Sequence, residues 1–196
     1  MSDPKPTTPW PDDGIERRDL HLRRIEMHGC QRSDGLYEVM GRLVDTKPDD
    51  FVPLAGGGRA VPAGEPIHHL GVRLVYDDQM TVREVHTFLD ATPYAVCAGG
   101  GEALQSLVGL RMTSGWSQEV RKRLNGWRSC AHLRELLGPM ATTAFQSLSV
   151  LRQGLPDRLD ANGKPLKIDS CYAYGAQLEL VEVRWPQYHI KGPRES

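Results

Sequence analysis

The chain has 196 residues, of which 39% are hydrophobic and 25% are charged, and its 24 Lys and Arg against 25 Asp and Glu leave a formal net charge of −1. This length and composition are typical of an ordinary globular protein that buries a core without disulfide staples, and the balanced charge does not favour nucleic acid as a partner. No apolar run approaches the roughly 18 residues of a membrane-spanning helix, and the N-terminus lacks the basic and apolar regions of a signal peptide. We therefore expect no membrane role and a cytoplasmic location.

The ends of the chain differ in composition from its middle. Residues 1–14 contain four prolines and few apolar residues, which favours a flexible arm. We expect a single α+β domain over residues 15–190 and a short tail over residues 191–196.

Two segments predict a β-hairpin near the N-terminus. Residues 20–31 and 36–45 have strand composition and flank the turn signal Ser33-Asp34-Gly35. Residues 47–66 are rich in proline and glycine and predict a long loop that could serve as a lid.

Residues 67–76 alternate regularly, which predicts a strand with a core face and an outer face. The core face carries an imidazole among apolar side chains: His68, Leu70, Val72, Leu74 and Tyr76. The turn after Tyr76 leads into residues 81–89, which predict an antiparallel partner strand. A histidine buried at the start of such a strand needs a polar partner.

The periodicity then changes to that of helices. Residues 102–110 show helical spacing, and Ser117 is a candidate N-cap for a short helix that ends at Asn125-Gly126. Ser129 is a candidate N-cap for a third helix, whose broad apolar stripe continues to Leu148. Gly138-Pro139 predicts a bend or break in this helix. Residues 166–190 return to strand composition around Gly175 and predict a C-terminal hairpin. The order of elements indicates an α+β fold in which an antiparallel sheet carries helices on one face.

Four residues form the candidate site. Cys97 and Cys130 precede predicted helices, where free backbone N–H groups and the helix dipole favour a thiolate. His132 lies two residues after Cys130, and His68 starts the core strand. Two thiolates and two imidazoles suit a tetrahedral zinc ion or an iron ion. The alternative is that both cysteines are small buried hydrophobic residues.

Other arrangements of the same residue types remain open. Cys97 or Cys130 is also a candidate nucleophile activated by His132, with Asp90 and Glu135 as nearby catalytic acids or bases. His69 is an alternative to His68 as a ligand. The glycine triplets at residues 56–58 and 99–101 lack the context of nucleotide-binding loops.

Two smaller features carry less weight. His28 and Cys30 share one face at a strand end, where a structural role outweighs a metal site. We expect Cys171 to be a core strand residue.

Several longer motifs resemble those of an uncharacterised bacterial family, the domain of unknown function 2889. The resemblance extends from about residue 17 to residue 185, and its motifs are G-R-L-V-D-T-K-P, G-E-P-I-H-H-L-G-V-R-L, D-A-T-P-Y-A-V-C, L-V-G-L-R-M-T-S-G-W and C-A-H-L-R-E-L-L-G-P-M-A-T-T-A-F-Q. It implies no particular activity.

The middle of the chain also resembles the U-type iron–sulfur scaffold proteins. The shared order is a hairpin, a cysteine before a helix, a second helix, and ligands that open a last helix. This resemblance implies the scaffold fold, with added N- and C-terminal hairpins, and places His68, Cys97, Cys130 and His132 around one centre. The scaffold family uses three cysteines with an aspartate and a histidine, whereas two cysteines match here, so a mononuclear metal site is favoured over an iron–sulfur cluster.

The sequence thus predicts a metal-binding protein, with zinc or iron at a His/Cys site, that acts as a metal-dependent enzyme on a small-molecule substrate. The alternatives are an iron–sulfur or metal carrier and assembly protein, a metal-free cysteine-dependent enzyme, and a binding domain with buried cysteines.

Overall fold

The structure is a computed structural model that describes residues 13–54, 57–149, 151 and 154–191. Almost all of the predicted arm and of the predicted tail lies outside this range. The chain divides into two compact units, residues 1–149 and 150–196, where the sequence predicts a single domain over residues 15–190. Each unit is described by itself.

The first unit is built on an antiparallel sheet of four strands in the order β1-β2-β3-β4. These strands are β1 (Leu22–Gln31), β2 (Tyr37–Thr46), β3 (Pro66–Tyr76) and β4 (Val82–Ala91). The predicted N-terminal hairpin is confirmed as β1 and β2, and it belongs to this same sheet. The turn that joins them places Gly35 at φ +85°, a conformation that glycine adopts without steric cost.

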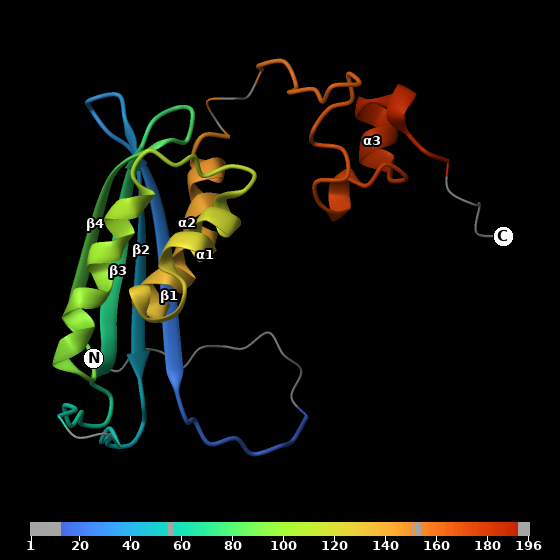
Figure 1. Cartoon of the computed structure of the whole chain (residues 1–196). Helices are drawn as coiled ribbons and strands as arrows, with labels where there is room; N and C mark the ends of the chain where they lie inside the picture. Colours follow the sequence, from blue (N-terminus) through green and yellow to red (C-terminus); the bar gives the residue numbers. More distant parts are fainter. Residues whose placement is uncertain (1–12, 55–56, 150, 152–153, 192–196) are drawn as a thin grey trace. The chain divides into compact units, whose positions relative to one another are not determined.

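Helical segments cover one face of the sheet (Figure 1). They are the 3₁₀ helix η1 (Ala95–Leu107), α1 (Trp116–Leu124), the short η2 (Gly126–Arg128) and α2 (Ala131–Ser147). α2 contacts β1, β2 and β3, and η1 contacts β4. The α+β prediction with helices on one face is therefore confirmed.

The core lies between this face and the helices, and the predicted core face of β3 supplies its centre. Leu70, Leu74 and Tyr76 are fully buried there, opposite the buried stripe of α2. α2 continues through Pro139, so the helix does not break at the predicted position. We attribute this to buried side chains on both sides of Pro139, including Leu137 and Met140, because tertiary packing supplies most of a helix's stability.

Two helix starts differ from the predicted caps. α1 is capped by Gly115 rather than Ser117, and α2 by Cys130 rather than Ser129. The hydroxyl of Ser129 instead donates a hydrogen bond to the carbonyl of Leu124.

The predicted C-terminal hairpin is wrong. Residues 166–190 form η3 (Tyr172–Tyr174), α3 (Glu179–Arg184) and η4 (Pro186–Tyr188). Val181 in α3 and Trp185 directly after it are both buried, and their spacing of four residues places them on one side of a helix. The sequence did not reveal this, because a short apolar run fits a strand or a helix equally well. Cys171, predicted in a core strand, is exposed.

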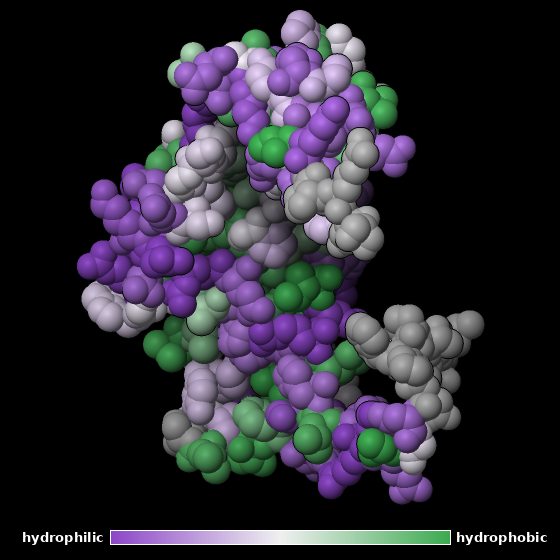
Figure 2. Space-filling view, turned by 90° about the vertical axis from the view of Figure 1, so that its right-hand side faces the viewer, coloured by the Kyte–Doolittle hydropathy of each residue, from purple (hydrophilic) through white to green (hydrophobic). Residues whose placement is uncertain are grey.

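The surface is mixed in character. Figure 2 shows hydrophilic residues interrupted by separate hydrophobic patches on one face. Scattered exposed apolar side chains are normal in folded proteins. No helix among the described residues is long and apolar enough to cross a membrane.

Candidate metal centre

Asp45 and His68 face each other across the β2–β3 pair. Both side chains belong to the sheet face that the helices cover, and Asp45 is only 1% exposed. Oδ2 of Asp45 lies 3.0 Å from Nδ1 of His68. Because an ionised carboxylate can only accept, Nδ1 carries the proton and Nε2 keeps its lone pair when the ring is neutral.

Asp45 is further held by Arg23 of β1. Nε of Arg23 donates to Oδ1 and Nη2 donates to Oδ2, each at 2.8 Å. Nε2 of His21 lies 3.1 Å from Oδ1. Burial raises the pKa of the Asp45 carboxyl, but the hydrogen bonds and charge of Arg23 together with the two histidines outweigh it, so the pKa is lowered and the group is ionised.

These contacts decide the role that Asp45 can have. A carboxylate offers about four lone-pair positions, and Arg23, His21 and His68 together make four contacts with its two oxygens. We infer that Asp45 orients His68 rather than binding a metal itself. Metal-binding histidines are oriented in this way by a carboxylate on the second ring nitrogen.

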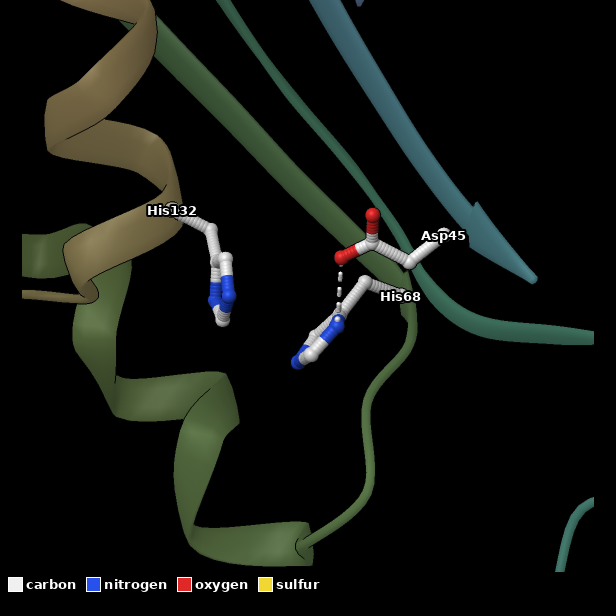
Figure 3. Close-up of side chains that lie close together, drawn as sticks. All are labelled: Asp45, His68 and His132. Carbon is white, nitrogen blue, oxygen red and sulfur yellow. Dashed lines mark hydrogen bonds and ion pairs between the residues drawn. The ribbon is translucent and has the colours of Figure 1, made fainter. Parts of the chain in front are cut away.

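His132, in the first turn of α2, completes the group. Figure 3 shows His132 projecting from α2 toward His68, while the free ring nitrogen of His68 points away from Asp45. The two ring centroids are 4.0 Å apart. One ligand atom from each of Asp45, His68 and His132 lies within 4.8 Å of the others. The sheet and α2 thus bring two histidines together from positions 64 residues apart in the sequence.

The surroundings keep His68 in the form that a metal needs. Burial lowers the pKa of His68, the neighbouring His132 lowers it further, and Asp45 offsets only part of this. His68 is therefore neutral at pH 7, which leaves Nε2 available as a donor.

Cys130 caps α2 and adjoins His132. Its Sγ lies 3.9 Å from Nδ1 of His132. Burial raises the pKa of the Cys130 thiol, but His132 and the backbone N–H groups of His132 and Leu133 lower it by more, so the net pKa falls. The contact with Cys130 in turn raises the pKa of His132 against the effect of burial. Lowered thiol pKa values mark cysteines suited to metal binding or nucleophilic attack.

Cys97 lies on η1 and, like Cys130, is not part of the three-residue group. Its position relative to Cys130 follows from Gly100, whose carbonyl accepts a hydrogen bond from the Cys130 N–H at 2.9 Å. Residues three apart on a 3₁₀ helix project on the same side. From this spacing we infer that Cys97 is on the side of η1 that meets Cys130.

The other candidates do not belong to the three-residue group. His69 is on the opposite sheet face, where Nδ1 lies 3.4 Å from Oδ2 of Asp90 and the ring meets Phe88 edge-on. Glu135 is held by Nη1 of Arg23 at 2.7 Å. Among the described residues, only the group that contains His68 brings three possible ligands together.

Sequence reasoning missed Asp45, Arg23 and His21. The signal for Asp45 was its place in the alternation of β2, since Val39, Leu43 and Asp45 share the buried face. A charge at such a position needs partners. Arg23 could be found only from the strand register, which pairs it with Asp45.

The family model described as Protein of unknown function (DUF2889) matches residues 21–146 of the chain. The match includes the four strands, η1, α1 and nearly all of α2, and with them every residue of the candidate centre. No curated protein and no solved structure matches the chain.

Proposed function

We propose that this chain, which belongs to the DUF2889 family, is a metal-binding protein that holds one zinc or iron ion at His68, His132 and Cys130, with Cys97 as the fourth candidate ligand. The observation that carries the proposal is the contact between His68 and His132, made while Asp45 occupies Nδ1 of His68.

The chemistry of the donors supports this choice. Imidazole nitrogen and thiolate sulfur suit zinc and iron better than magnesium or calcium. Ligands must bind without their protons. The lowered pKa values of His68 and Cys130 favour that state, whereas the contact with Cys130 raises the pKa of His132 and works against it. Free thiols at all four cysteines suit a reducing compartment, so we propose a cytoplasmic location.

Whether Cys97 binds the ion determines whether the metal site is open or closed. If His68, His132 and Cys130 alone hold the ion, a fourth position is left for water or a substrate, and the ion can act as a Lewis acid. If Cys97 also binds, the site is closed and structural. We favour the open form and a metal-dependent enzyme that acts on a small molecule.

The segment before β3 is suited to cover such a substrate. Phe51 and Val61 pair as a bridge, and the guanidinium of Arg59 donates to the carbonyl of Pro66, two residues before His68. The proline- and glycine-rich loop is thus anchored close to the start of β3.

The first experiment measures metal content and affinity in protein purified without an affinity tag and without oxygen. We expect about one zinc or iron ion per chain and its loss in His132→Ala and in His68→Ala. His69→Ala is the matched control, because His69 is adjacent in sequence but lies on the other face of the sheet. Full metal content in both His68→Ala and His132→Ala would rule out the proposed centre.

Two further results would change the assignment. More than one iron with acid-labile sulfide would favour the iron–sulfur carrier. Cys97→Ser separates the open site from the closed one, because only a closed site loses affinity when this thiol is removed.

A metal-free cysteine enzyme is the second candidate, and the contact between Cys130 and His132 favours it. It predicts that iodoacetamide alkylates Cys130 at a pH below that of an ordinary thiol and that His132→Ala slows this reaction. Peptide mapping by mass spectrometry with and without added zinc checks it. Protection of Cys130 by zinc supports the metal centre instead.

A further inference from the structure

A concave site apart from the candidate metal centre lies on the first unit where α1 ends and η2 begins. It is a hollow of about 500 Å³ lined by Gln118, Arg121, Lys122, Asn125 and Arg128. Three of these side chains are cations and two are amides, so the lining is rich in hydrogen-bond donors and contains no carboxylate.

Among the residues that the structure describes, no acid forms an ion pair with these cations. Glu119 of α1 pairs with Arg123 at 3.1 Å. Within the described part of the chain, no carboxylate lies within 4.0 Å of Arg121, Lys122 or Arg128. The helix dipole explains cations in the last turn of α1, but Arg128 lies beyond that helix, in η2. A concave surface lined by one sign of charge concentrates ions of the opposite sign.

A hollow of mixed polarity adjoins the basic one and shares Gln118 with it. This adjoining hollow has a volume of about 540 Å³, and its lining combines the apolar side chains of Trp116, Ala141 and Phe145 with the hydroxyls of Ser117 and Thr142. Together the two hollows offer donors for an anion at one end and apolar surface beside hydroxyls at the other.

We propose that the basic hollow binds the phosphate-type dianion of a small molecule whose apolar or aromatic part occupies the adjoining hollow. Arginine suits such an anion because its planar donors can contact two oxygens at once. The site is separate from the proposed metal centre, and binding there does not require a metal.

The test titrates the whole chain with inorganic pyrophosphate and with phenyl phosphate, at constant ionic strength, by calorimetry and by backbone amide NMR shifts. We expect saturable binding that shifts amides of residues 118–128. Arg121→Gln/Arg128→Gln should weaken both ligands by about tenfold or more, since each loses a charge-assisted hydrogen bond. Ala141→Phe, which fills the adjoining hollow next to its apolar residues, should weaken phenyl phosphate but not pyrophosphate.

Arg42→Gln/Arg73→Gln is the matched control, because it removes two exposed arginines from the helix-free face of the sheet. If both double variants weaken ligand binding equally, the effect is general charge attraction and the proposed site is wrong. Binding that does not saturate below roughly 10 mM ligand would also overturn the proposal. Tighter binding of a single-stranded oligonucleotide, with a steep salt dependence, would overturn the small-molecule assignment. Thermal melting confirms that each variant is folded.

Discussion

Asp45 and His68 are cross-strand neighbours joined by a contact of 3.0 Å between Oδ2 and Nδ1. The pair fixes which nitrogen of His68 is free, and thereby links the sheet register to the chemistry of the candidate centre.

Replacing Asp45 by asparagine should weaken metal binding. The amide keeps the volume of the carboxylate but loses its charge, so it holds the Nδ1–H of His68 less firmly. Loss of such an orienting partner typically costs roughly 10- to 100-fold in metal affinity. Zinc competition with a chromophoric chelator measures this, and Asp90→Asn, at the partner of His69 on the other face, serves as the control. Equal affinity in Asp45→Asn and wild type would exclude the orienting role.

Removing Arg23 should destabilise the first unit. Arg23 joins Asp45 on β2 to Glu135 on α2, and its loss leaves a buried carboxylate with only histidine partners. An uncompensated buried charge costs about 3 kcal/mol or more. Urea unfolding of Arg23→Ala measures the change in the free energy of unfolding, and Arg42→Ala, exposed on the other face of β2, should change it little. A loss in Arg23→Ala no larger than that of the control would contradict this account.

Glycine at position 100 allows η1 to approach Cys130. A Cβ there would lie 2.8 Å from the Cβ of Cys130 and 3.0 Å from its backbone nitrogen. Gly100→Ala should therefore displace the start of α2, lower stability by about 1 to 3 kcal/mol and reduce metal content. Gly99→Ala is the control, because a Cβ at Gly99 meets nothing within 4 Å. The two alanine variants should differ clearly in thermal unfolding, and indistinguishable melting curves would disprove the close approach.

The turn between β3 and β4 should contribute acid-sensitive stability. Burial raises the pKa of Asp77, but the N–H of Thr81 and the guanidinium of Arg83 lower it by more. Because the folded pKa is below the unfolded value of about 3.9, the contribution is complete above that value and disappears as the pH falls through the folded pKa. Asp77→Asn should cost about 1 to 2 kcal/mol at pH 7 and progressively less below pH ~4. A cost in urea unfolding that does not change between pH 7 and pH ~3 would refute this.

Local pattern was sufficient for much of the fold. Alternation and turn signals predicted both hairpins of the sheet. They also predicted which face of β3 is buried, including the side chains of Leu70 and Tyr76. The same approach failed for residues 166–190, because Val181 and Trp185 satisfy a helical turn as well as a strand. Nothing local in that segment distinguishes the two.

For the candidate centre, the sequence by itself determined that His68 faces inward and that Cys130 and His132 open a helix. Only the tertiary structure decided that α2 lies against the sheet where His68 and Asp45 meet, and that Arg23 reaches the same carboxylate from the edge strand. The physical reason is that a strand pattern specifies which side a residue faces, whereas strand register and helix packing specify its neighbours. Those neighbours set the protonation of Asp45, His68 and Cys130, and with it the chemistry available at the site.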